Sequence, residues 1–189
     1  RQLTNSPAPE TQPAWSTDGK TIVFRSDRDR GGLFLTSAHG GPERQLSSFG
    51  VNPVWSPDGS EILFSSGFAE LFTGLHAVAA DAGSPPLVLL GELMRGGAWH
   101  SFAPHPDGRI SLYGLDVKSG FGFYTVSRDG KRVTASKFDK ALPLQWNEQG
   151  ARLRRFRWNK SGTALFVEAV IPEVQNVWRV RVDPATLDW

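Results

Sequence analysis

Four histidines, His39, His76, His100 and His105, are the side chains of this sequence best suited to metal ligation or to proton transfer near neutral pH. They are scattered, with no His-Glu-x-x-His and no paired spacing, so a zinc centre would have to be assembled from distant loops. We therefore interpret them as loop or turn histidines. The sequence predicts no metal site and no cofactor.

A catalytic nucleophile is not indicated either. The Gly-x-Ser-x-Gly elbow of serine hydrolases does not occur, and the absence of cysteine excludes thiolate nucleophiles and thiolate zinc sites. Asp27-Arg-Asp29-Arg lacks the ligand pattern of a calcium loop, and Gly120-Phe-Gly122 lacks the third glycine of a dinucleotide site. We predict no catalytic residues in this segment and treat it as noncatalytic.

The densest positive run is Arg152-Leu-Arg-Arg-Phe-Arg157-Trp. Simple two-residue alternation along a strand separates its side chains onto two faces. One face is expected to hold Leu153, Arg155 and Arg157, and the other Arg154, Phe156 and Trp158.

Arg155 and Arg157 are the candidate ligand-binding residues, because arginines that line a channel or loop face can hold an anionic ligand or an acidic peptide. The pair Trp99 and His100 is expected to contribute to the same surface, together with the connection from Phe138 to Gly150. The alternative is that these are ordinary surface or packing residues.

Composition limits the partners. The formal net charge is only +2 and charged residues make up 21%, which argues against direct nucleic-acid binding. No apolar run approaches the roughly 18 residues of a membrane span, so no membrane insertion is expected. Because Arg1 is not an initiator methionine, we interpret the chain as a segment of a longer polypeptide.

An internal repeat organises the chain. Residues 13–26 recur as residues 53–66, with Trp-Ser-x-Asp-Gly followed by an apolar strand in both copies. Looser copies lie at residues 104–113 and 156–166. The structural repeat residues are Trp15, Asp18, Gly19, Trp55, Asp58, Gly59, Asp107, Gly108, Trp158 and Gly162.

A period near 40 with short strands between turns is typical of β-propeller blades. The Asp-Gly pairs suit tight hairpins, and the tryptophans are expected to fill the gaps between adjacent blades. The predicted fold is thus all-β, a propeller of four-stranded antiparallel blades. One domain of four blades is expected, at about 5–47, 48–90, 91–136 and 137–189.

The last copy lacks an outer strand, whereas Arg1-Gln-Leu-Thr4 repeats Arg44-Gln-Leu-Ser47 with no blade before it. Residues 1–4 are therefore a possible closing strand. Four blades can form a small closed ring or part of a larger propeller, and an incomplete ring would permit oligomers.

These motifs resemble the TolB-like, WD-type propeller repeat of bacteria. The resemblance implies one of three settings: the sensory part of a bacterial regulator or kinase, the substrate-gating propeller of a prolyl-oligopeptidase-like serine peptidase, or a periplasmic envelope scaffold. We expect the first, a binding module for a protein, peptide or small-molecule partner. A periplasmic or other extracytoplasmic location is favoured over a cytoplasmic one.

Overall fold

The computed structural model describes residues 1–66, 74–81, 83–137, 152–171 and 174–189. The chain forms two compact units, Arg1–Gly91 and Glu92–Trp189. Within the described residues the regular structure is nearly all β-strand, apart from the short helix α1 (Gly91–Arg95) and a 3₁₀ turn at Arg28–Arg30. The prediction of an all-β chain is confirmed. The connection from Phe138 to Gly150 lies outside the described residues.

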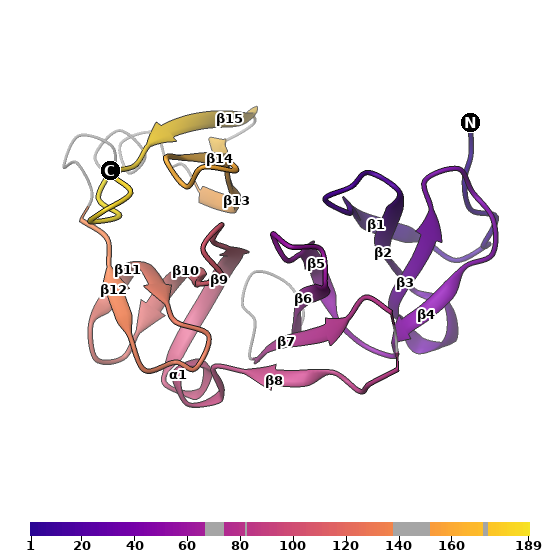
Figure 1. Cartoon of the computed structure of the whole chain (residues 1–189), viewed down its shortest axis with the longest axis horizontal. Helices are drawn as coiled ribbons and strands as arrows, with labels where there is room; N and C mark the ends of the chain where they lie inside the picture. Colours follow the sequence, from indigo (N-terminus) through magenta and orange to yellow (C-terminus); the bar gives the residue numbers. More distant parts are fainter. Residues whose placement is uncertain (67–73, 82, 138–151, 172–173) are drawn as a thin grey trace. The chain divides into compact units, whose positions relative to one another are not determined.

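The first unit contains two four-stranded antiparallel sheets (Figure 1). Each is a meander whose strands pair in chain order, as expected for propeller blades. The first sheet comprises β1 (Glu10–Trp15), β2 (Thr21–Ser26), β3 (Gly32–Ser37) and β4 (Arg44–Ser47). The second comprises β5 (Val51–Trp55), β6 (Glu61–Ser66), β7 (Gly74–Ala79) and β8 (Leu87–Leu89).

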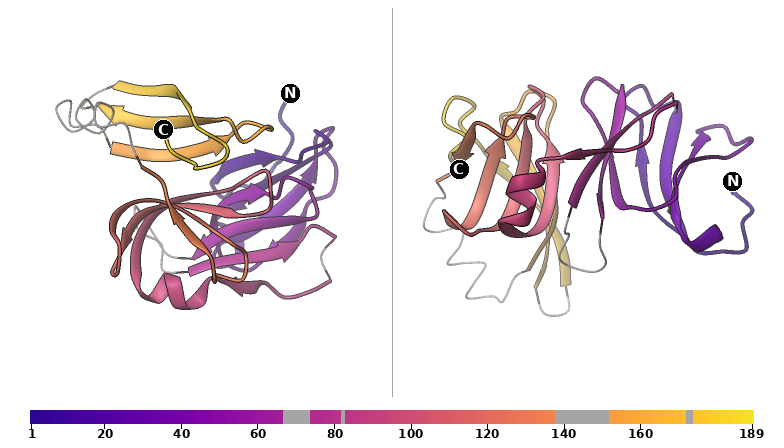
Figure 2. Two further views of the ribbon diagram at one scale, coloured as in Figure 1. Left: turned by 60° about the vertical axis from the view of Figure 1, so that its left-hand side comes forward. Right: turned by 90° about the horizontal axis from the view of Figure 1, so that it is seen from below.

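The second unit has the same organisation. Its four-stranded sheet comprises β9 (Gly97–Pro104), β10 (Ile110–Asp116), β11 (Gly120–Val126) and β12 (Val133–Ala135). Its other sheet has three described strands, which lie side by side in Figure 2, namely β13 (Arg152–Trp158), β14 (Ala164–Ile171) and β15 (Val174–Arg181). The four sheets correspond to the four predicted blades.

Residues 1–4 form no strand. Leu3 lies close to Gly40: its carbonyl oxygen and side chain are within 4 Å of the position that a Cβ atom on Gly40 would occupy. This segment therefore lies against the first unit. The closing strand and the single-domain assignment stay predictions.

Each unit has a core between its two sheets. In the first unit, Val23 and Leu35 pack with Trp55 and Phe64. In the second, the rings of Phe123 and Phe156 meet edge to face at 4.5 Å between centroids. The repeated apolar strands therefore bury one sheet face against the neighbouring blade of the same unit, as a blade must.

The innermost strand of every sheet carries a β-bulge, a site where an extra residue bends the strand and redirects side chains. In β1 and β5 the bulges include Gln12 and Asn52, both with φ of 54°. In β9 and β13 the extra residues are His100 and Arg154.

The bulge at Arg154 corrects one sequence-based expectation. Leu153 pairs with Ala169 and Arg155 pairs with Glu168, so alternation is interrupted between them. Leu153 consequently packs against the core of the second unit, on the same side as Phe156, and not on the face of Arg155. A bulge shifts the register by one residue, which simple alternation cannot anticipate.

Candidate functional site

Five turns among the described residues share one hydrogen-bond pattern. In each, the amide of the first turn residue donates to a carbonyl four or five residues later. A glycine amide also donates to the carbonyl of that first residue, three positions earlier, at 2.8 to 3.1 Å, and the glycine φ lies between 69° and 88°. This left-handed conformation favours glycine. The donor and acceptor pairs are Gly19 and Ser16, Gly59 and Ser56, Gly108 and His105, Gly130 and Ser127, and Gly162 and Asn159.

Four of these turns coincide with the predicted repeat motifs. The fifth, at Ser127-Arg-Asp129-Gly130, joins β11 to β12 in an outer hairpin, and its motif was not among the predicted repeat copies. Its signal was present, because the letters Ser-x-Asp-Gly are those of the first two copies.

The aspartates of these turns have lowered pKa values for local structural reasons. The Ser16 hydroxyl and the Lys20 amide donate to Asp18 and lower its pKa. The Ser56 hydroxyl and the Ser60 amide and hydroxyl lower the pKa of Asp58 to about 2. Hydrogen bonds stabilise the ionised carboxylate in this way. These carboxylates act as turn residues that are held ionised.

The third turn differs because His105 replaces the serine. Its Nδ1 lies 2.7 Å from Asp107 Oδ1, and its ring meets Trp158 edge to face at 4.5 Å. Nε2 is buried and makes no hydrogen bond within the described part of the chain. Burial lowers the pKa of His105, opposed in part by Asp107. The histidine is a neutral packing residue at this turn.

Two of the repeat tryptophans connect neighbouring sheets of the same unit. The indole Nε1 of Trp55 donates to the Ala14 carbonyl, and that of Trp158 to Ser111 Oγ, both at 3.0 Å. Each bond links a sheet to the preceding one in its unit. Trp15, by contrast, is 58% exposed, and its role in filling a gap between blades stays a prediction.

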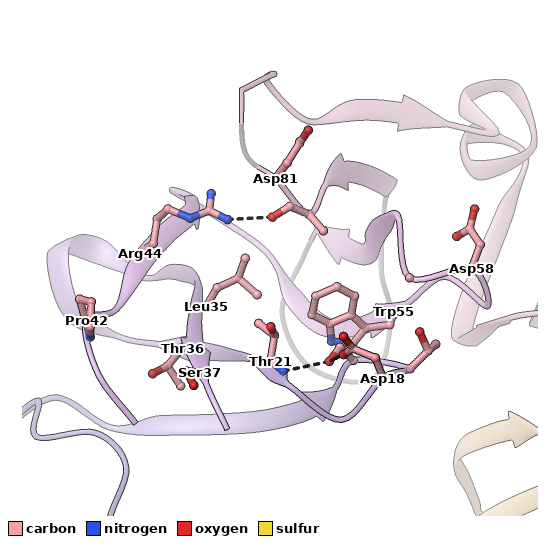
Figure 3. Close-up of a pocket in the computed structure, with 14 residues that line it drawn as sticks. Asp18, Thr21, Leu35, Thr36, Ser37, Pro42, Arg44, Trp55, Asp58 and Asp81 are labelled. Carbon is pink, nitrogen blue, oxygen red and sulfur yellow. Dashed lines mark hydrogen bonds between the residues drawn. The ribbon is translucent and has the colours of Figure 1, made fainter. Parts of the chain in front are cut away.

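A pocket of about 550 Å³ lies at the turn end of the first unit (Figure 3). Its wall includes Trp55 and the turn carboxylates Asp18 and Asp58, which are already hydrogen-bonded within their turns. Arg44 also lines it and donates to the Ala80 carbonyl at 2.7 Å. The charged groups named here serve the fold, and we assign this pocket no ligand.

The predicted ligand residues separate into two groups. Trp99 is fully buried, its indole lies 3.4 Å from the Leu93 carbonyl, and its ring meets Tyr124 edge to face. It is a packing residue and lines no ligand surface, which corrects the expectation. His100 is partly exposed at the β9 bulge, with its ring 5.8 Å from that of Phe121.

Arg155 and Arg157 lie on one face of the last sheet. The register aligns Arg157 with Phe166 of β14 and Phe166 with Arg179 of β15. Directly paired residues point to the same side of a sheet. We call two neighbouring cross-strand rows of this surface the arginine face; they are Arg155, Glu168 and Val177, and Arg157, Phe166 and Arg179.

Most of the arginine face is open. Arg155, Phe166, Val177 and Arg179 are exposed. Arg155 Nε lies 3.2 Å from Glu168 Oε2, and Gln175 also donates to Glu168. The single carboxylate of the face is thus already engaged.

Arg157 is the most enclosed cation of the arginine face. Its Nη1 donates to the Phe156 carbonyl at 2.8 Å. Burial, and secondarily the charge of Arg155, lower its pKa to about 10, while Glu168 acts in the opposite direction. Burial destabilises a cation, so a bound anion would restore favourable electrostatics.

Sequence reasoning found two members of this face and missed Phe166 and Arg179. They lie on other strands, and only the pairing of β13, β14 and β15 brings them beside Arg157. The available signal was two-residue alternation, which places Phe166 opposite Leu165 and Val167, and Arg179 opposite Val180 and Val182.

No group of three or more potential metal-ligating side chains occurs in the parts of the chain that the structure describes. Among those same residues, no helix has both the length and the apolar character needed to cross a bilayer.

Blades of this kind define the class of β-propeller repeat proteins. No protein-family model matches the chain. It is 45% identical over 65 residues to a Bacillus subtilis (strain 168) protein described as the uncharacterized peptidase YuxL, a match that covers 32% of this chain and 10% of that protein.

Two solved structures are similar over nearly the whole chain. One, from Agrobacterium tumefaciens and assigned as TolB, has a TM-score of 0.65 at 22% identity, covering 98% of this chain and 62% of that one. TolB from Acinetobacter baumannii has a TM-score of 0.64 at 17% identity, covering 95% and 42%. The chain therefore has the TolB-like β-propeller fold, as its repeats predicted. It spans less than two thirds of each of these relatives.

Proposed function

We propose that this chain is a noncatalytic propeller module that binds a protein partner through the arginine face of its last sheet. The observation that carries the proposal is the alignment of Arg157, Phe166 and Arg179 across three strands. Aromatic and arginine side chains are the types most enriched where proteins bind one another.

A comparison with the equivalent positions of the first sheet supports a role for the arginine face other than apolar packing between blades. The residue before the repeat tryptophan is Ala14 in the first sheet and Arg157 in the last. Ala14 pairs with Val23 and Val23 with Leu35, and these three pack against the second sheet. In the last sheet, Arg157 and Arg179 stand at the two outer positions of the equivalent row, where the first sheet has apolar residues.

In the wider protein we propose a sensory role, in which partner binding to the propeller is passed to a signalling or DNA-binding domain. A location outside the cytoplasm accompanies this proposal and rests on the TolB-like resemblance. Protease accessibility of the full-length protein in spheroplasts tests the location. Digestion only after cell lysis would contradict it.

A second candidate has one specific observation in its favour, the 45% identity to a segment of a protein described as a peptidase. In that case the propeller gates a catalytic domain that lies elsewhere in the full-length chain. Fold alone does not decide between the two.

A fluorophosphonate probe, which labels activated serines, separates these candidates when applied to the full-length protein. We expect no labelling for a sensor. Labelling that disappears when a serine outside residues 1–189 is replaced would establish the gating role. Labelling lost on replacement of a serine within these residues would overturn the noncatalytic proposal itself.

A further inference from the structure

Three features were the strongest candidates for a further site: the pocket of the first unit, the His100 ring cluster and the arginine face. The charged groups named above in the pocket are engaged in turns and backbone contacts. Near His100, Tyr113 and Phe121 pack edge to face, which is accounted for as blade packing. The arginine face combines unneutralised charge with exposed apolar groups.

Resting on the proposed function, we infer that the arginine face binds an extended acidic peptide segment of the partner, one that carries apolar residues among its acidic ones. Three arginines face one carboxylate there, and that carboxylate, Glu168, already forms an ion pair with Arg155 and accepts a hydrogen bond from Gln175. The charge left over on the face is positive. An acidic partner complements it.

The arrangement of the arginines matches the dimensions of a peptide. Arg155 and Arg157 are two residues apart along β13, a separation of about 7 Å, and Arg157 and Arg179 are two strands apart, about 10 Å. Side chains on one side of an extended peptide repeat every ~7 Å, so acidic residues at such intervals can meet successive arginines. Guanidinium groups also bind carboxylates in a bidentate manner.

Apolar side chains lie between the charges. Phe166, 43% exposed, lies between Arg157 and Arg179, and Val177, 70% exposed, lies beside Glu168. Phenylalanine alone could stack on a nucleic-acid base, but the aliphatic valine offers no ring for stacking. The apolar part of the face favours a peptide with aliphatic or aromatic residues over a nucleic acid.

Binding is tested on the full-length protein with three fluorescein-labelled probes of similar length: a peptide of alternating Glu and Val, a peptide of alternating Lys and Val, and an oligothymidylate. By fluorescence anisotropy we expect the Glu-Val peptide to bind at least tenfold more tightly than either of the others. Affinity for the oligothymidylate that equals that for the Glu-Val peptide, and that Arg157→Gln weakens equally, would identify a general polyanion surface and overturn the inference.

The residues are tested by Arg157→Gln and Arg179→Gln, each expected to weaken Glu-Val binding about 5- to 10-fold. Lys118→Gln is the matched control, because it removes an exposed positive charge from the turn between β10 and β11. Equal losses in all three variants would show that only net charge matters. Unchanged binding in the two arginine variants would also contradict the proposal.

Accessibility of the face in the whole protein is a separate requirement. The segment has no cysteine, so Val177→Cys introduces one thiol, and Val117→Cys, at a position 74% exposed in another blade, is the control. If the full-length protein has other cysteines, they are first replaced. We expect maleimide to label both variants at similar rates. A protected Cys at position 177 beside a reactive one at 117 would mean that another blade covers the face, which overturns the inference.

Failure here and failure of the proposed function are distinguishable. Serine labelling within residues 1–189 would refute the noncatalytic module whatever the peptide result. Absence of peptide binding with no serine labelling would refute only the acidic-peptide inference.

Discussion

The indole nitrogen of Trp55 donates a hydrogen bond to the carbonyl of Ala14, 41 residues earlier, across the boundary between two blades. Trp15 occupies the same place in its own repeat and is largely exposed. Identical motif positions therefore differ in burial within the described residues.

Trp55→Ala should lower the free energy of unfolding by about 3 to 5 kcal/mol, because it removes a buried ring and an inter-blade hydrogen bond. Trp15→Ala should cost less than about 1 kcal/mol, as should His100→Ala. Urea unfolding followed by circular dichroism measures all three. Similar losses for the two tryptophan variants would refute the packing assignment.

Gln12→Ala should lower the free energy of unfolding by about 1 to 2 kcal/mol. Gln12 Oε1 accepts a hydrogen bond at 2.8 Å from the backbone amide of Asn52, which lies in the bulge of the next blade. Gln12→Glu retains an acceptor at this position and is the matched control. Comparison of the two urea midpoints isolates the hydrogen bond. Equal destabilisation by both variants would assign the effect to another property of the side chain.

Asp58 should make stability depend on pH in the acid range. Its folded-state pKa, about 2, is below the ordinary 3.8, so its contribution is full above pH 3.8 and is lost as the pH falls toward 2. Stability measured between pH 5 and 2 in the wild type and in Asp58→Asn tests this. The variant should start less stable and show a shallower decline. Parallel curves would contradict the turn assignment.

His105 should make stability depend on pH in a higher range than Asp58 does. Burial lowers its pKa below 6.5, so the neutral ring is preferred in the folded protein, and stability should fall as the pH drops through and below 6.5. His105→Gln should flatten the pH dependence between 7 and 5, whereas substitution of the exposed His39 by Gln should leave it unchanged. Carbon-bound imidazole proton shifts in NMR report the titration directly. A titration midpoint of His105 above pH 6.5 would contradict the expected lowering of its pKa.

Much of the fold follows from local sequence. The Trp-Ser-x-Asp-Gly motifs specify their turns because the serine and aspartate side chains hydrogen-bond the backbone nearby and glycine adopts positive φ, as at Gly19 and Gly59. The apolar runs after those turns become β2 and β6 because they fit a buried strand. These interactions span few residues, so the amino-acid sequence alone reveals them.

What only the tertiary structure decided depends on partners distant in sequence. The bulge at Arg154 moved Leu153 into the core, and the burial of Trp99 removed it from the candidate surface. The pairing of β13, β14 and β15 added Phe166 and Arg179 to the two arginines that the sequence had singled out. Register and burial arise from the packing of whole strands, and composition along one strand does not contain them.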